Sequence, residues 1–222
     1  MKKVLIFSLA YYPYVGGAEV AVKEITDRID PAYIEFHLIT LRFNRHDPKE
    51  ETIGNVHVHR IGMGRDRIQK FIFQFSAAWK ALSLHKLHRF DATWALMAHS
   101  AGIPAGLFKT VHSEIPYILN LQEGDPPRQI ERTMRPLWPL FVRSFTSADI
   151  VQPISNFLGR WARERNFTGP IIVIPNGADT RNFEKAAIAH DGIVLITTSR
   201  LVYKNAIDDV IRSLRQIRRA HV

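Results

Sequence analysis

Short runs of consecutive apolar residues alternate with longer segments of helical periodicity along the whole sequence. Runs such as VLIF, IIVI and IVLI have no polar face, which is typical of parallel strands buried on both sides. Such runs predict strands at residues 3–9, 33–40, 56–61, 92–97, 116–121, 149–153, 171–174 and 193–198. Helical periodicity predicts helices between most of them, at residues 18–29, 67–88, 101–112, 129–144, 156–165 and 205–220. Because strands and helices alternate at this spacing, the sequence predicts right-handed βαβ units and a doubly wound, mainly parallel α/β sheet.

The segment IPNGADTRNFEKAAIAHDG marks a predicted domain boundary. Pro175, Asn176 and Gly177 end a strand with turn-forming residues, a polar stretch follows, and a new apolar run starts at Ile193. We therefore assign residues 1–187 to one domain and residues 188–222 to a second. One strand and one helix cannot enclose a core, so residues 188–222 are expected to be the truncated start of a domain.

The composition excludes several kinds of chemistry. The 222 residues include no cysteine, which rules out disulfides, cysteine-ligated zinc and thiol nucleophiles. No apolar run approaches the ~20 residues of a membrane span. The basic, apolar N-terminus lacks the small-residue cleavage site of a signal peptide, so we expect a first strand there and a cytoplasmic protein.

The formal net charge of +9 is compatible with three partners: nucleic acid, an anionic membrane surface or phosphorylated small molecules. The basic residues are dispersed among the predicted helices. Neither zinc-finger spacing nor an aromatic RNA-binding signature is present. No nucleic acid is therefore expected as a partner.

The stretch YYPYVGGAEV follows the first predicted strand and precedes the first helix. In an open α/β sheet this is an edge where ligands bind, and a Gly16–Gly17 pair lets the backbone approach a phosphate or a sugar hydroxyl. The alternative is a tight turn whose glycines require a positive φ. The spacing differs from both G-x-G-x-x-G and a P-loop, so a nicotinamide cofactor is disfavoured.

A second candidate phosphate site is the stretch SRLVYKN. Arg200 and Lys204 flank a predicted strand-to-helix turn, where two cations and a helix N-terminus suit a diphosphate. Two solvated surface charges are the alternative interpretation.

Four segments carry a family resemblance when they are taken together. YPYVGGAEV, FTSADIVQPIS, IPNGADTRNF and SRLVYKN occur in that order, and the chain resembles the retaining GT-B glycosyltransferases of the large family four. The resemblance implies a Rossmann-like acceptor-side domain, followed by the first strand and helix of a Rossmann-like donor-side domain. It implies transfer of a hexose from a nucleotide-sugar to a glycan or lipid-linked acceptor, with retention of configuration, as in polysaccharide biosynthesis.

The resemblance also implies roles for individual residues. Gly16 and Gly17 match the family's glycine loop beside the donor phosphates, and Arg200 and Lys204 match the residues that grip the donor diphosphate. Tyr14 is expected to contact the acceptor. Asn176 and Gly177 match the interdomain linker and are expected to be structural.

Two departures from the family pattern stand out. The family commonly has a histidine after the fifth strand, whereas this chain reads LNLQEGDP. Gln122 and Glu123 are therefore the predicted catalytic positions, with Asp125 beside them. A glutamine, unlike a histidine, cannot shuttle a proton. The alternative is a loop that is simply rich in turn-forming residues.

The second departure concerns the donor side. The paired glutamates that hold the nucleotide and sugar in the family do not occur in SRLVYKN or after it. The chain alone is expected to have an incomplete donor site. The alternative function is a non-catalytic module that binds acceptor or membrane and needs a partner to supply the donor domain.

Histidines offer one further candidate site residue and no metal site. His99, at the carboxyl end of the fourth predicted strand in this count, is a candidate acceptor contact, with helix capping as the alternative. His57 and His59 share a strand face, but no carboxylate or third ligand follows at metal spacing. No metal cofactor is therefore expected, and the nucleotide-sugar is a substrate.

The predicted helix at residues 67–88 is basic and aromatic. Such a helix can lie on an anionic membrane, which would place the protein at the inner face of the membrane. The alternative is a helix packed in the core with a solvated basic face. The residues expected to face the core are Ile68, Phe71, Ile72, Phe75, Trp79 and Leu82.

Overall fold

The computed structural model describes residues 1–64, 66–182, 194–199 and 201–220. The chain divides into two compact units, Met1–Ala178 and Asp179–Val222, and each is described by itself. The predicted boundary at residue 187 lies outside the described residues, so it stays a prediction.

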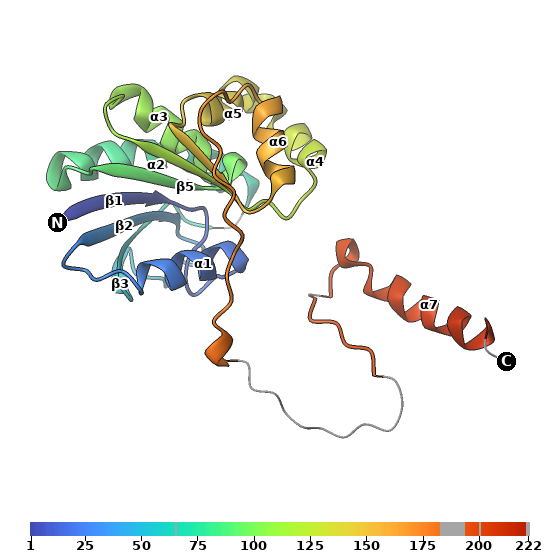
Figure 1. Cartoon of the computed structure of the whole chain (residues 1–222). Helices are drawn as coiled ribbons and strands as arrows, with labels where there is room; N and C mark the ends of the chain where they lie inside the picture. The colour runs from blue at the N-terminus through green and yellow to red at the C-terminus, as the bar shows by residue number, and fades with distance from the viewer. Residues whose placement is uncertain (65, 183–193, 200, 221–222) are drawn as a thin grey trace. The chain divides into compact units, whose positions relative to one another are not determined.

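The described part of the first unit contains one seven-stranded sheet in the order β3-β4-β2-β1-β5-β6-β7 (Figure 1). Neighbouring strands are parallel except β3 and β4, which are antiparallel. The strands are β1 (Lys2–Phe7), β2 (Ile34–Leu41), β3 (Glu50–Ile53), β4 (Val56–Ile61), β5 (Ala92–Leu96), β6 (Tyr117–Leu121) and β7 (Ile150–Pro153). The helices are α1 (Gly17–Thr26), α2 (Arg67–His88), η1 (Ala98–Gly102), α3 (Ile103–Val111), α4 (Pro127–Met134), η2 (Arg135–Leu137), α5 (Trp138–Thr146) and α6 (Asn156–Glu164). The predicted doubly wound, mainly parallel α/β sheet is confirmed.

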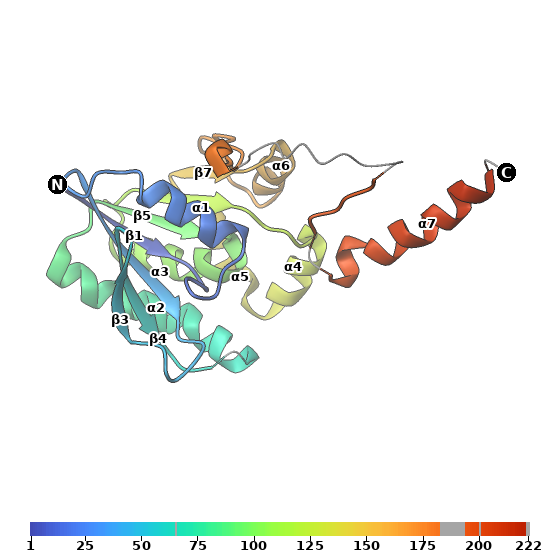
Figure 2. The ribbon, with the colours of Figure 1, turned by 90° about the horizontal axis from the view of Figure 1, so that it is seen from below.

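Helices cover both faces of this sheet, because successive side chains of each strand point to opposite faces. On one face Ile6 and Leu38 pack with α1, which lies in front of the strands when seen from below (Figure 2). On the other face Leu5, Phe7 and Ile39 pack with α2, α3 and α5. All five of these strand side chains are completely buried.

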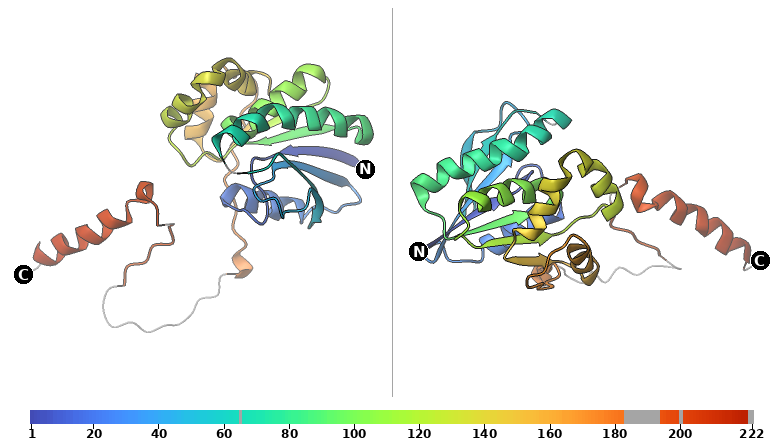
Figure 3. Two further views of the ribbon diagram at one scale, coloured as in Figure 1. Left: turned by 180° about the vertical axis from the view of Figure 1, so that it is seen from behind. Right: turned by 90° about the horizontal axis from the view of Figure 1, so that it is seen from above.

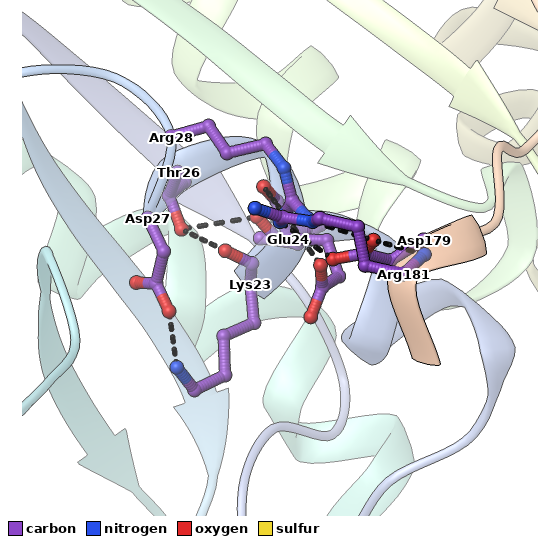
Figure 4. A network of polar contacts seen from close by, with 8 residues as sticks. Lys23, Glu24, Thr26, Asp27, Arg28, Asp179 and Arg181 are labelled. Carbon is purple, nitrogen blue, oxygen red and sulfur yellow. Dashed lines mark hydrogen bonds and ion pairs between the residues drawn. The ribbon is translucent and has the colours of Figure 1, made fainter. Parts of the chain in front are cut away.

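Polar contacts fix the end of α1 (Figure 4). The Thr26 hydroxyl donates to the carbonyl oxygen of Val22 at 3.0 Å, and Lys23 forms an ion pair with Asp27. The side-chain amide of Asn55, in the β3–β4 turn, donates to the carbonyl oxygen of Thr26 at 3.1 Å. These contacts tie the C-terminal end of α1 to this hairpin.

The bounds of α2 agree with the prediction from the sequence. The Asp66 carboxylate caps the helix by accepting from the Gln69 amide at 2.7 Å. Arg89 follows the last helical residue as the C-cap, with a left-handed conformation (φ 57°), and its amide donates to the carbonyl oxygen of His85 at 2.9 Å. No aspartate or glutamate occurs between Arg67 and His88.

The predicted core face of α2 is wrong for five of its six residues, and only Leu82 packs against the core as expected. Trp79 is 78% exposed, Ile68 69% and Phe71 48%, and Ile72 and Phe75 are also exposed. Small residues let α2 approach the sheet and α3 closely (Figure 3). The buried residues of the helix are Phe73, Gln74, Ala77, Ala78, Ala81 and Leu84. We call the exposed set Ile68, Phe71, Ile72, Phe75 and Trp79 the outer face of α2. None of the described helices is both long and apolar enough to cross a membrane.

Three further elements differ from the predicted ones. The strand β3 was not predicted, because EETI is a polar, partly exposed edge strand with little hydrophobic pattern. The predicted helix at residues 129–144 is divided into α4, η2 and α5, since Pro136 and Pro139 cannot continue the backbone ladder. The predicted strand at residues 171–174 forms one parallel bridge, between Ile171 and Val151, with Pro170 and Pro175 on either side.

The second unit contains η3 (Thr180–Asn182), η4 (Tyr203–Asn205) and α7 (Ile207–Ala220). The predicted strand at residues 193–198 starts outside the described residues, and residues 194–198 form no strand. In the described part of this unit, residues 194–198 have no neighbouring strand with which their backbone could form the hydrogen bonds of a sheet. The predicted helix is confirmed, beginning two residues later than expected.

A glycine at the contact between η1 and α5 provides a test of the packing. A Cβ added to Gly102 would lie 2.8 Å from the Cβ of Ser144, whose side chain is completely buried. We expect Gly102→Ala to lower the free energy of unfolding by about 1–3 kcal/mol through overpacking. Urea denaturation measures this change. Gly17→Ala is the matched control, because its Cβ would meet no heavy atom within 4 Å, and an equal loss in both variants would contradict the packing explanation.

Candidate functional site

Most predicted site residues lie in loops that follow β1, β5 and β6 at the carboxyl edge of the sheet. The loop after β1 carries Tyr14 and Gly16, the turn after β5 carries His99, and the loop after β6 carries Gln122 and Glu123. Ligands of open α/β sheets bind outside this edge. We call these loops, with the cavity beside them, the candidate functional site.

Gly16 and Gly17 lead into α1 and differ in their surroundings. The Gly16 amide donates to Glu19 Oε2 at 2.6 Å, so it is used within the chain. Gly16 has φ −125°, and Gly17 also lacks a positive φ, so the tight-turn alternative is wrong. A Cβ at Gly17 would have no heavy atom within 4 Å. The space beside Gly17 is therefore open to a ligand that approaches the backbone.

Arg60, at the carboxyl end of β4, holds this glycine loop in place. Its side chain is 2% exposed, and it donates to the carbonyl oxygens of Tyr12 at 2.6 Å and Pro48 at 3.2 Å. It also forms an ion pair with Glu51. The sequence gives no signal for this role, because a single arginine in a strand has the pattern of a surface residue.

The turn η1 begins at a strained residue. Met97 has φ 67° and ψ 130°, a conformation that costs of order 1–3 kcal/mol for a non-glycine residue. Its carbonyl oxygen accepts from the amides of Ala101 and Gly102, both at 3.1 Å. The resulting π-helical turn places His99 at the edge of the site, with its side chain 32% exposed.

Glu123 is a buried carboxyl group beneath this turn. Its Oε1 accepts from the Ala98 amide at 2.7 Å and lies 3.9 Å from His99 Nδ1. Glu123 Oε2 and His99 Nδ1 have no hydrogen-bond partner within the described part of the chain. Burial raises the pKa of the Tyr117 phenol well above its ordinary value, and the charge of Glu123 raises that pKa further. The Glu123 side chain is 0% exposed, so its position suits it to orient His99 and η1.

Gln122 is held by amide contacts on both sides. Its Nε2 donates to Asn120 Oδ1 at 2.7 Å, and its Oε1 accepts from Asn176 Nδ2 at 2.8 Å. Asn120 in turn donates to the carbonyl oxygen of Gln152 at 3.0 Å. The structure therefore joins the loop after β6 to the end of the first unit, and it agrees with the expectation that Asn176 is structural.

Tyr14 lies toward the loop that follows β2. Its hydroxyl donates to Asp47 Oδ1 at 3.2 Å, and its ring makes an edge contact with Phe43 at 5.1 Å between centroids. Its role toward an acceptor remains a prediction.

A cavity of about 570 Å³ opens beside His99 and the N-terminal half of α2. Arg67, Lys70 and His99 are its basic lining residues, while Leu9 and Phe71 are among its apolar ones. Phe71 also belongs to the outer face of α2, so the cavity is continuous with that face. The remaining lining residues are Gln74, Ser100, Thr133, Met134, Pro136 and Leu137.

The predicted diphosphate contacts cannot be placed in this site. Arg200 lies outside the described residues. Lys204 lies in η4 of the second unit, and its side chain is likewise outside the described part. Both roles stay predictions.

Comparison with known proteins gives a family match. The family model described as Glycosyltransferase Family 4 matches residues 15–182, which is more than half of the chain. No curated protein matches the chain by sequence.

Several solved structures are similar in fold. Sucrose-phosphate synthase from Thermosynechococcus elongatus has a TM-score of 0.63 and 14% identity, over 84% of this chain and 51% of that chain. A second structure of that synthase has a TM-score of 0.58 and 13% identity, over 80% and 91% of the two chains. The α,α-trehalose-phosphate synthase (UDP-forming) from Burkholderia vietnamiensis has a TM-score of 0.52 and 16% identity, over 74% and 42%. At such identities the likeness concerns the fold alone. The chain spans about half the length of the first of these synthases.

Proposed function

The chain belongs to glycosyltransferase family 4, and from that premise we propose that it takes part in hexose transfer from a nucleotide-sugar to a lipid-linked acceptor. In this proposal the first unit supplies the acceptor side of the site, and the anomeric configuration of the sugar is retained. The observation that carries the proposal is the continuity between the cavity at the carboxyl edge and the outer face of α2.

The lining of the cavity supports an acceptor that is both anionic and apolar. Arg67 and Lys70 offer cationic groups for a phosphate or another acid, and His99 offers a hydrogen bond to a hydroxyl. Phe71, 48% exposed, continues the apolar lining onto the surface. A water-soluble glycan needs no such surface, whereas a lipid-linked one has an acyl or prenyl chain that remains in the membrane. A glycolipid is therefore favoured over a free glycan.

The donor side of the proposal rests on Gly17, Arg200 and Lys204. The acceptor oxygen forms a bond to the anomeric carbon while the bond from that carbon to the diphosphate breaks, and the acceptor's proton is released overall. Negative charge grows on the departing diphosphate, so cations placed beside it lower the barrier. Open space beside Gly17 supports close approach of the donor to the backbone.

The acceptor hydroxyl is oriented by His99 in this proposal. The Gln122 amide accepts and donates hydrogen bonds but does not transfer a proton, so it is not assigned a role as acid or base. Its bonds to Asn120 and Asn176 hold the loop after β6. The buried carboxylate of Glu123 lies 3.9 Å from His99 Nδ1 and favours one ring orientation. Glu123 is accordingly a positioning residue.

The donor-side role of Gly17 can be tested by filling the open space. We expect Gly17→Val to raise the donor KM at least about tenfold, equivalent to about 1.4 kcal/mol of lost contact. The acceptor KM and the free energy of unfolding should change little, because a Cβ at this position meets no heavy atom within 4 Å. Steady-state kinetics with each substrate varied in turn separates these effects. Gly17→Ala should give a smaller change of the same sign, and an unchanged donor KM in both variants would remove Gly17 from the donor site.

The function itself is tested by transfer of labelled sugar. The chain is mixed with a panel of nucleotide-sugars and with lipid-linked acceptors in mixed micelles, and labelled glycolipid is measured. Product formation supports the proposal, and Lys70→Ala should weaken acceptor binding. Specific acceptor binding without transfer from any donor would instead favour the second candidate, a non-catalytic acceptor- or membrane-binding module. The outer face of α2 is the observation that supports that alternative.

A further inference from the structure

A group of histidines and glutamates lies at the amino end of the sheet, away from the candidate functional site. The group comes from β2, β3, β4 and the last residue of α2. It lines an open hollow of about 430 Å³. We call it the histidine cluster; its members are Glu35, His37, Glu50, His57, His59 and His88.

Four members form a line of close polar contacts. Glu35 Oε1 lies 2.5 Å from His37 Nε2, and His37 Nδ1 lies 3.0 Å from His59 Nε2. His59 Nδ1 lies 3.3 Å from Glu50 Oε1. His37 is 3% exposed and His59 is 7% exposed, so the centre of the line is protected from solvent.

The number of protons on this line is smaller than the number of contacts. Each of the three contacts joins two acceptor atoms unless a proton lies between them, and two neutral imidazoles supply one proton each. One of the three contacts therefore has no proton, and two acceptor atoms face each other there. A metal cation at one end of the line satisfies all three contacts.

The cation has a place at the Glu35–His37 contact. His88 approaches the same contact from the end of α2, with its ring centroid 4.2 Å from that of His37. The ligating atoms of Glu35, His37 and His88 all lie within 4.8 Å of one another. Two imidazole nitrogens and a carboxylate oxygen are a donor set that suits Zn²⁺ and related divalent transition metals.

We propose that Glu35, His37 and His88 form a binding site for a divalent transition metal ion of the Zn²⁺ type. The adjoining hollow leaves room for water or for the exposed His57 as a further ligand. Glu35 and His88 are half-buried, so small side-chain rotations bring their atoms to the ~2.0–2.2 Å metal distances of such sites.

The rest of the line provides the outer contacts that such a site needs. With the metal on His37 Nε2, His37 Nδ1–H donates to His59 Nε2, and His59 Nδ1–H donates to Glu50. Lys80 Nζ, 3.2 Å from Glu50 Oε1, balances the charge of that carboxylate. Outer partners of this kind fix the tautomer and the ring orientation of a ligating histidine. The site ties the end of α2 to β2, so we assign it a stabilising role.

Sequence patterns do not predict this site, because its ligands come from separate elements. Glu35 and His37 are two residues apart and lie on the same face of β2, whereas His88 is the last residue of α2. Only the packing of α2 on the sheet brings them together. His57 and His59 lie in β4, so the spacing of residues around them does not point to these ligands.

The test measures Zn²⁺ binding by the whole chain, with any affinity tag removed, at a pH near 8. Calorimetric titration should give one site with 1:1 stoichiometry, and the melting temperature should rise with Zn²⁺ but not with Mg²⁺. Both His88→Gln and Glu35→Gln should weaken Zn²⁺ binding about tenfold or more. Co²⁺ should give visible absorption bands that are lost in the same two variants.

His112→Gln is the matched control. His112 belongs to another histidine pair, with its ring centroid 4.4 Å from that of His85 and its Nδ1 3.2 Å from Glu114 Oε1. This control should bind Zn²⁺ as the unmodified chain does. The proposal is overturned if the unmodified chain does not bind Zn²⁺, or if His88→Gln and Glu35→Gln bind it as tightly as His112→Gln does.

Discussion

Replacing Phe75 and Trp79 with alanine is expected to reduce binding to anionic vesicles by roughly 10³-fold. Phe75 is 43% exposed and Trp79 is 78% exposed, and both belong to the outer face of α2. Transfer of each ring into the lipid interface contributes about 2 kcal/mol, and about 1.4 kcal/mol corresponds to a factor of ten. Exposed Arg67 and Lys70 add attraction to anionic headgroups, which falls as salt is added.

Cosedimentation with vesicles measures this binding. Vesicles of phosphatidylglycerol mixed with phosphatidylcholine should bind the chain more tightly than phosphatidylcholine alone. Phe157→Ala is the matched control, since Phe157 is 56% exposed on a different helix, α6. The double variant should unfold as the unmodified chain does, because surface substitutions usually change stability by less than about 0.5 kcal/mol. Equal vesicle binding by the double variant and the control would show that α2 is not the membrane contact.

The same helix shows where sequence patterns stop being informative. Both ends of α2 were predicted correctly from its periodicity, but its buried face was assigned to the bulkier side chains. Periodicity gives the angle between residues around a helix and does not identify the neighbour that each face meets. Here Ala77 and Ala81 face the sheet and α3, because small side chains allow close packing. Trp79 is left outside.

The fold class and the family were predictable because they depend on features repeated along the chain. Apolar runs without a polar face specify a parallel sheet, and the resemblance to family four, carried by four short segments in order, is confirmed by the family match over residues 15–182. The edge strand β3 was missed because a polar strand has no such run.

The candidate site was predictable only in outline. Its loops follow from the topology, since the carboxyl ends of parallel strands share one edge. The contacts within it do not follow, because they join residues from different elements. The bond from Arg60 to the carbonyl oxygen of Tyr12 and the bond from the Ala98 amide to Glu123 both depend on the register of neighbouring strands.

The largest effect on stability is expected from Glu123→Ala, which should lower the free energy of unfolding by about 3–4 kcal/mol. The substitution removes a carboxylate that is 0% exposed, leaves the Ala98 amide without its acceptor, and opens a cavity. A buried unsatisfied amide costs about 1–3 kcal/mol, and the cavity adds to this. Urea denaturation followed by circular dichroism measures the loss.

Glu123→Gln separates the hydrogen bond from the charge. The glutamine keeps the volume and an oxygen that can accept from the Ala98 amide, so we expect a loss of only about 1 kcal/mol. If Glu123 acts by orienting His99, this variant should lower kcat for transfer while the donor KM stays unchanged, because the carboxylate 3.9 Å from His99 Nδ1 is gone. His99→Gln should then lower kcat by a similar factor, and the double variant should be no worse than either single one, since residues that act as a unit are not additive. Independent, multiplying effects would instead assign His99 and Glu123 to separate roles.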